Sequence, residues 1–490
     1  MNTVNIGAGR WVCWDWELIE KSENIRLSMH KPVRKNIAMK CDAPWEGEYC
    51  GYISTTEVGD TYRLYYRAMG EQALNNGCRG SFCMAESKDG KTFTKPKICQ
   101  FEFNGSKENN IVFFEDRFLD NFAVVYDTNP NCPADAKFKA MSQLFDVEKQ
   151  TAKLGYYKSA DGIRFEFVCV IPVPGAFDSH NVVMWNPYTE CYHLYLRNFH
   201  LPDGSDWDWN KPGYEQAVRD IRLSVSEDFV HWSEPRQIQY QEGAREYQLY
   251  TNQVSKYPRA DIFIGMPARY CDRKAESWNY KHLPQWDGTM LNNRLTYLEN
   301  GDRTGTALTE CILMTSRDGM YFNRTDEAFL APGVQNGSNW VYGEGYVSHG
   351  LVETTADWPG EPNELSFYTM VGYRTRPTDV VRYAVRMDGF YSWRADFAGG
   401  EILTKPMTFA GEKLSVNFAT SAMGALRIRF CDLDGNDLEG YDSGTLFGDS
   451  IDRPVEFEKS LADLSGKPVR MKLNLWDCDL YSFCFEEDKV

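Results

Sequence analysis

The stretch Ser87-Lys88-Asp89-Gly90-Lys91-Thr92-Phe93 decides the fold, because its pattern returns along the 490-residue chain. Each copy places an Asp, usually followed by Gly, ahead of an aromatic residue. The other copies are Ser159–Phe165, Ser226–Trp232, Ser316–Phe322 and the degenerate Met387–Tyr391. Their aspartates (Asp89, Asp161, Asp228, Asp318 and Asp388) lie 72, 67, 90 and 70 residues apart. Self-similarity at a long period is typical of a radial or stacked repeat.

Asp-Gly is turn chemistry, because the Asp side chain bonds nearby backbone and Gly adopts a positive φ. We therefore expect each copy to be a hairpin tip between outer strands. Three short runs rich in β-branched and aromatic residues precede each tip. These runs are 51–55, 62–67, 81–85, 121–126, 138–144, 154–158, 181–185, 192–197, 221–226, 249–254, 262–267, 310–315, 350–353, 365–370 and 381–386. Five tips predict an all-β fold, a five-bladed β-propeller. The alternative, an array of β-sandwiches, rarely repeats at about 70 residues.

The sequence pattern predicts two domains. Residues 1–395 form the propeller, with residues 1–40 as a lead-in, and Ala398-Gly399-Gly400 looks like a linker. Residues 396–490 lack the repeat and alternate between strand-like runs and turns, which predicts a small antiparallel β-sandwich. We expect this sandwich to pack against the propeller; sugar binding by it is the alternative.

Composition limits the partners. The formal charge of −17 argues against nucleic acid, because phosphate contacts need clustered Lys and Arg. The 14 cysteines show no paired spacing, the N-terminus has no signal-peptide pattern, and no run of 18 apolar residues occurs. These features predict a cytoplasmic protein with reduced thiols and no membrane partner. We predict no cofactor, and a homo-oligomer stays open.

Carboxylates stand where the innermost strand of each predicted blade begins. In a propeller these starts converge on one face of the central channel. The segments are Trp45-Glu46-Gly47-Glu48, Asp120-Asn121, Phe177-Asp178-Ser179-His180-Asn181, Arg245-Glu246-Tyr247 and Tyr342-Gly343-Glu344-Gly345.

On these features the chain resembles the five-bladed propeller glycoside hydrolases of families 32 and 43, some of which carry a C-terminal β-sandwich. The resemblance rests on the repeated tips, on residues 59–66 and on the carboxylates at the strand starts. It implies that a first-blade acid is nucleophile or base, a second-blade Asp stabilises the transition state, and a later blade supplies a Glu acid. The chain lacks Trp-x-Asn-Asp-Pro, Arg-Asp-Pro and Glu-Cys-Pro, so it looks like a divergent branch.

Cleavage of a glycosidic bond needs two carboxyl groups, one protonated and one ionised. Glu46, beside the aromatic Trp45, is the first candidate for base or nucleophile, with Asp42 and Glu48 as rivals. Asp178 is a candidate acid or substrate-orienting residue. The other acid candidates are Glu246 and Glu344.

Cationic and polar side chains are the candidates for substrate binding. Arg67, Arg197 and Arg269 each end a second strand, where they either pair with central carboxylates or bind a charged sugar such as a uronate or phosphosugar. The remaining binding candidates are Trp45, as an aromatic surface for a sugar ring, and Asp120, Asp127, His180, Asn181 and Tyr250. We predict no metal, because no second His lies at ligand spacing from His180.

The favoured function is a glycoside hydrolase that releases a terminal furanose, fructose or arabinose, from a small saccharide. One alternative is a phosphorolytic enzyme similar to the mannoside phosphorylases of family 130. The other is a propeller that binds sugars without cleaving them.

Overall fold

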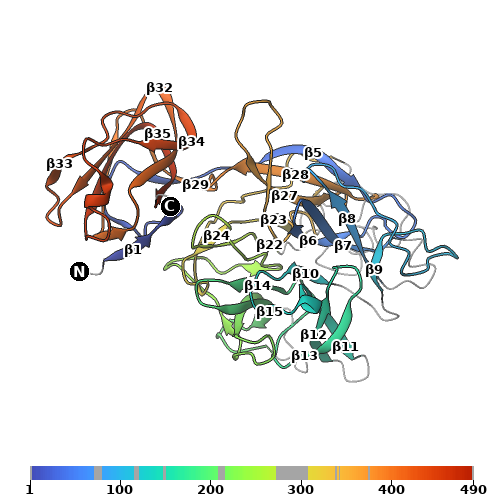
Figure 1. Ribbon diagram of the computed structural model, residues 1–490. Helices are drawn as coiled ribbons and strands as arrows, with labels where there is room; N and C mark the ends of the chain where they lie inside the picture. Colours follow the sequence, from blue (N-terminus) through green and yellow to red (C-terminus); the bar gives the residue numbers. More distant parts are fainter. Residues whose placement is uncertain are drawn as a thin grey trace, which may run out of the picture.

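The structure is a computed structural model that describes residues 3–70, 80–114, 121–146, 151–207, 216–271, 307–336, 339–340, 343–373 and 376–487. Within these ranges the chain is all-β, with only short 3-10 turns such as Ala134–Ala136 beside the strands. Figure 1 shows a larger body of several sheets and a smaller one that contains both chain ends. No helix in the described part is long and apolar enough to cross a membrane.

The first three sheets of the larger body each contain four antiparallel strands in chain order. The first is β6 (Gly51–Val58), β7 (Thr61–Ala68), β8 (Ser81–Ser87) and β9 (Ile111–Phe114). The second is β10 (Ala123–Tyr126), β11 (Phe138–Asp146), β12 (Thr151–Ser159) and β13 (Glu166–Ile171). The third is β14 (Val182–Asn186), β15 (Cys191–His200), β16 (Val218–Ser226) and β17 (Arg236–Gln237).

The fourth repeat is interrupted. Its strands divide into the sheets β19–β22–β23 and β18–β25–β24–β21–β20. The strands are β18 (Gln239–Tyr240), β19 (Gln248–Leu249), β20 (Ser255–Lys256), β21 (Phe263–Gly265), β22 (Ala268–Cys271), β23 (Leu308–Cys311), β24 (Met314–Ser316) and β25 (Tyr321–Arg324). Pro267, between β21 and β22, has no N–H to donate, and Gln253 adopts φ 45° in the first run. The three predicted runs therefore do not form continuous strands.

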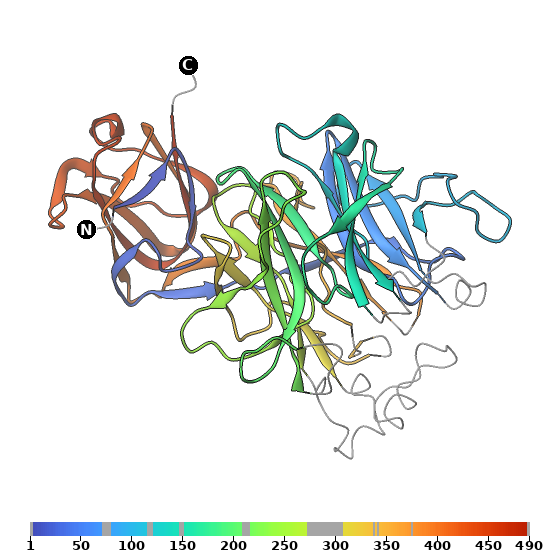
Figure 2. The ribbon, with the colours of Figure 1, turned by 90° about the horizontal axis from the view of Figure 1, so that it is seen from below.

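The last sheet of the larger body takes its outer strand from the N-terminal region. Its order is β26–β27–β28–β5. The strands are β26 (Val352–Thr354), β27 (Glu364–Val371), β28 (Asp379–Arg386) and β5 (Val33–Lys40). β6 contacts both β27 and β10, β10 contacts β14, and β14 contacts β20. Consecutive sheets are therefore neighbours, and the last returns to the first (Figure 2).

The repeated tips form turns of one kind. In the first, the Asp89 carboxylate accepts from the N–H groups of Lys91 (2.8 Å) and Thr92 (3.0 Å), and Ser87 Oγ accepts from Gly90 N at 2.9 Å. Asp161, Asp228 and Asp318 repeat this pattern. The first three tips lie between the third and fourth strands of their sheets, and the fourth lies between β24 and β25, so each is a hairpin tip as the Asp-Gly chemistry predicts.

Tyrosines join three of the tips to a neighbouring sheet. A hydroxyl on the second strand of one sheet donates to a tip carbonyl of the next: Tyr368 to Gly90 (2.5 Å), Tyr65 to Gly162 (3.0 Å) and Tyr195 to Gly319 (2.8 Å). The repeated turn thus fixes neighbouring sheets to one another as well as ending a hairpin.

A buried network of neutral groups connects the inner strands. Ser54 Oγ accepts from Val124 N at 3.1 Å and lies 3.2 Å from His180 Nε2. His180 Nδ1 lies 3.0 Å from Gln253 Oε1. Burial, with His349 nearby, lowers the pKa of His180 to about 3, so its ring is neutral. This layer holds the inner strands together and contributes no charge to the centre.

The smaller body combines the two ends of the chain. β2 (Gly9–Val12) pairs with β35 (Arg470–Glu486), and β3 (Ile19–Glu23) pairs with β30 (Gly400–Thr404). Its other strands are β1 (Val4–Gly7), β4 (Arg26–Met29), β29 (Tyr391–Ala395), β31 (Met407–Phe409), β32 (Lys413–Cys431), β33 (Asp437–Asp442) and β34 (Asp449–Val455). Residues 4–29, which the sequence assigns to a propeller lead-in, thus pair with C-terminal strands.

Asp388, the Asp of the degenerate fifth tip, connects the two bodies. Its carboxylate is fully buried and is 3.2 Å from Arg10 and 3.0 Å from Arg259. Tyr257 and Ser482 also donate to it, at 2.6 and 2.7 Å. After this tip β29 joins the smaller body, which leaves the outer place in the last sheet to β5.

Candidate functional site

Tyrosine rings gather where inner strands of different sheets meet. Tyr52 of β6 stacks on Tyr346 with ring centroids 6.1 Å apart, and Tyr346 stacks on Tyr250 at 5.5 Å. Tyr52 adopts φ 50°, an unfavourable conformation for an aromatic residue. Packed rings hold it there, and together they form a rigid aromatic floor in which Tyr52 and Tyr346 are buried.

Buried arginines cover this floor. The Arg67 guanidinium lies 4.2 Å from the ring of Tyr49 and 4.8 Å from that of Tyr52. Arg197 lies 5.4 Å from the ring of Tyr250 and forms an ion pair with Asp178. The Asp178 side chain is 38% exposed, so this pair stays within reach of solvent.

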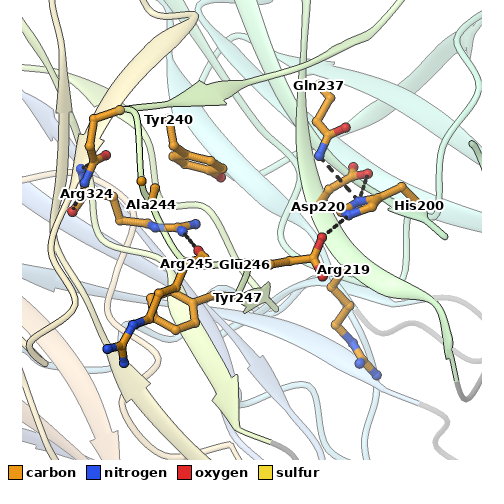
Figure 3. A pocket seen from close by; sticks show the side chains of 12 residues that line it. His200, Arg219, Asp220, Gln237, Tyr240, Ala244, Arg245, Glu246, Tyr247 and Arg324 are labelled. Carbon is orange, nitrogen blue, oxygen red and sulfur yellow. Dashed lines mark hydrogen bonds and ion pairs between the residues drawn. The ribbon is translucent and has the colours of Figure 1, made fainter. Parts of the chain in front are cut away.

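A cavity of about 290 Å³ lies beside this floor, between the third and fourth repeats (Figure 3). Its lining residues are His200, Arg219, Asp220, Gln237, Tyr240, Gln241, Gly243, Ala244, Arg245, Glu246, Tyr247 and Arg324. Arg219 connects the two places, because its guanidinium lies 5.2 Å from the ring of Tyr250. Aromatic, cationic and acidic groups therefore converge on one space of about the size of a sugar ring or a short saccharide.

His200 lies between two carboxylates in this cavity. Its Nδ1 is 3.0 Å from Asp220 Oδ2 and its Nε2 is 3.0 Å from Glu246 Oε1 (Figure 3). Asp220 is buried and also pairs with Arg222 at 3.1 Å, whereas the Glu246 side chain is 60% exposed. The hydrogen bond to Asp220 raises the pKa of His200; burial opposes it and Glu246 adds to it. The three groups form a chain from the protein interior to an exposed carboxylate.

We expect His200 to make stability depend on pH. Its folded-state pKa is raised above the unfolded value of about 6.5. Its contribution is therefore fully present below about pH 6.5 and is lost as pH rises through the folded pKa. His200→Gln should remove this component from a plot of Tm against pH between about 5 and 9. His231→Gln, on an exposed tip, is the matched control. Parallel curves for His200→Gln and the parent would contradict the expectation.

Glu46 lies away from the cavity. Its side chain is fully buried, Lys95 donates to it at 2.6 Å, Tyr66 at 2.5 Å and Ala43 N at 2.9 Å. The indole of neighbouring Trp45 donates to Asn110 at 2.8 Å. These contacts favour a structural role for Glu46 within the first sheet.

The other predicted residues divide between structural contacts and the site. Asp127 is buried against Lys139 and Tyr192, and Arg269 pairs with Glu310. His180 and Asn181 lie in buried networks. Glu344 is buried and accepts from Trp340 N beside a separate small cavity. Asp120 and Tyr342 lie outside the described residues. The structure brings Asp178, Arg197, Tyr250 and Arg67 to the aromatic floor, and Glu246 to the cavity.

Sequence reasoning missed His200, Asp220, Arg219 and Arg324. The available signal was alternation: neighbouring residues on a strand point to opposite faces. On β16, Arg219 therefore joins the aromatic floor and Asp220 joins His200. No group of three or more His, Cys, Asp or Glu in the described part is placed to hold a metal ion.

No family model and no curated protein matches the chain. Among solved structures, it is similar to an N-acetylgalactosamine deacetylase from F. plautii in complex with blood group B trisaccharide (11% identity, 74% of this chain, 96% of that chain, TM-score 0.46). It is also similar to a glycosyl hydrolase from Bacteroides ovatus (11%, 76%, 96%, TM-score 0.38). A third belongs to the GH130 family of mannoside phosphorylases, which contains glycoside hydrolases that target β-1,2 mannosidic linkages in Candida mannan (12%, 72%, 94%, TM-score 0.39). At these TM-scores the similarities assign no activity to this chain.

Proposed function

We propose that this protein is a glycoside hydrolase whose site is the cavity beside the aromatic floor. The observation that carries the proposal is the Asp220–His200–Glu246 chain, which ends in an exposed carboxylate inside that cavity. Glycosidic cleavage needs a carboxyl group that gives and takes a proton at a fixed position. His200 supplies the fixed position for Glu246, and Asp220 orients the ring of His200.

The proposed mechanism assigns two carboxylates. Glu246 is the general acid, protonating the leaving oxygen of the glycosidic bond. Asp178 is the second carboxylate: it takes a proton from the water whose oxygen bonds to the anomeric carbon as the bond to the leaving oxygen breaks. The ion pair with Arg197 fixes its position. The rings of Tyr240 and Tyr247 line the cavity, and the guanidinium of Arg324 lies against both.

The finer parts of this proposal concern architecture and substrate. We propose that the larger body is a five-bladed propeller and that the smaller body is a β-sandwich, which strands β1–β4 and β29 join from the segment that the sequence assigns to the propeller. The succession of sheets and their return from last to first support the propeller. The resemblance to families 32 and 43 supports a terminal furanose as the released sugar. The free state of the described cysteines supports a reducing, cytoplasmic location, where small saccharides are the available substrates.

The test is a hydrolysis assay with the full chain. Purified protein is incubated with 4-nitrophenyl furanosides and pyranosides and with short oligosaccharides, with and without inorganic phosphate. We expect release of a reducing sugar from at least one furanoside without phosphate. Products that appear only with phosphate would replace hydrolysis by phosphorolysis. If saccharides bind but stay intact, the protein is a sugar-binding propeller and not an enzyme.

A further inference from the structure

The cavity holds a buried positive charge that no carboxylate neutralises at close range. Arg324 is 5% exposed and lines the cavity. Within the described residues no Asp or Glu oxygen lies within 4.0 Å of its guanidinium. The carboxylate of Asp326 pairs instead with Arg245, at 3.6 Å, and acts on Arg324 only through space.

The contacts of Arg324 hold its position and leave its charge in place. Its guanidinium lies 4.0 Å from the ring of Tyr240 and 4.7 Å from that of Tyr247. One terminal nitrogen donates to the carbonyl of Arg245, and Nε has no hydrogen-bond partner in the described structure. A buried cation of this kind is costly unless an anion approaches it. Two aromatic faces pre-organise it for such an anion.

The neighbouring arginines add to this charge. Arg219 and Arg245 line the same cavity as Arg324. The opposing charges are Asp220, which pairs with Arg222, and Glu246, which bonds to His200. Arg324 and Arg245 lie on one side of the cavity, whereas Arg219 lies on the other side with His200 and Glu246, as Figure 3 shows.

We propose that this cavity binds the acidic group of a sugar, the carboxylate of a uronate or the phosphate of a sugar phosphate ester, against Arg324. The inference deepens the proposed function, on which it rests for the presence of a saccharide, by naming the substrate class. Guanidinium groups bind both oxyanions through charge-assisted hydrogen bonds, and Nε of Arg324 is available for one. The volume of about 290 Å³ fits one such ring.

The test compares sugars that differ only in charge. Binding of D-glucose, D-glucuronate, D-glucose 6-phosphate and inorganic phosphate to the full chain is measured by titration calorimetry. We expect one or both acidic sugars to bind about tenfold or more tightly than glucose. If glucuronate is preferred, the acidic group is a carboxylate; if glucose 6-phosphate is preferred, it is a phosphate. Equal binding of glucose and both acidic sugars, or inorganic phosphate binding as tightly as either, would overturn the proposal.

Variants assign the preference to Arg324. Arg324→Gln should abolish it with little loss in Tm, because the change removes a buried charge without leaving an ionised partner behind. Arg245→Gln, at a 76% exposed position, should weaken the preference as well. It serves as the test variant if Arg324→Gln does not fold. Arg164→Gln, on an exposed tip, is the matched control and should leave it unchanged. A preference that survives in both cavity variants refutes the site. Calorimetry measures binding and does not require turnover. The comparison of acidic and neutral sugars can therefore be interpreted even if the hydrolysis assay detects no product.

Discussion

Glu246→Gln is expected to lower kcat for the best substrate by about 10²–10⁴-fold, because it removes the proton that the leaving oxygen needs. The amide keeps the shape of the carboxylate and is 60% exposed, so stability should change by less than about 0.5 kcal/mol. Steady-state kinetics and thermal unfolding of the same preparation separate these effects. KM should change little, since the amide N–H still donates a hydrogen bond to the leaving oxygen.

Two variants control this experiment. Glu242→Gln changes an exposed carboxylate four residues away in the same loop and should leave kcat unchanged. Glu46→Gln should lower Tm with little effect on kcat, since it takes one of two counter-charges from the half-buried Lys95, which keeps Asp42. If Glu246→Gln kept the parental kcat, or if Glu46→Gln lowered kcat more than Glu246→Gln did, the general acid would not be the carboxylate in the cavity.

The sequence predicted the all-β class and the position of most strands in the first three repeats. Local chemistry was sufficient there, because the Asp of each tip bonds to backbone two and three residues ahead. The Ser-x-Asp-Gly pattern carries the whole turn. Prediction from sequence works where a structure depends on neighbours in the chain.

The pairing of the two chain ends could not be predicted in this way. β5 lies beside β28, more than 300 residues later, and β2 beside β35. Nothing in the local pattern of residues 33–40 distinguishes an outer strand of the first sheet from one of the last. Strand partners are chosen by the burial of whole faces, which depends on the complete chain.

The candidate site could not be predicted from the sequence for a related reason. The carboxylates at strand starts were a sound signal for charge, but Glu46 is satisfied by Lys95 and Tyr66 inside its own sheet. Whether a carboxylate is paired depends on distant partners. The cavity forms between β15, β16, residues 237–247 and Arg324 of β25, and so has no single motif.

Asp388→Asn is expected to have the largest effect on stability. The change keeps the shape of the side chain but leaves Arg10 and Arg259 buried or half-buried without their counter-charge. Removing one partner of a buried ion pair costs about 3–5 kcal/mol. This cost should lower Tm by roughly 5 °C or more. Asp89→Asn, at an exposed tip, is the matched control: Asn still accepts from the turn backbone, so Tm should change little.

The pH dependence of Tm is a second test of the role of the Asp388 carboxylate. Burial raises the pKa of Asp388, but Arg10, Arg259 and the hydrogen bond from Tyr257 outweigh it, and the net pKa is lowered. The stabilisation is therefore present above the unfolded pKa of about 3.9 and is lost as pH falls through the folded value. In Tm measurements from pH 7 down to about 3, the gap between the parent and Asp388→Asn should narrow at the acid end. A gap that stays constant, or a parental Tm in Asp388→Asn at pH 7, would show that this carboxylate does not hold the two bodies together.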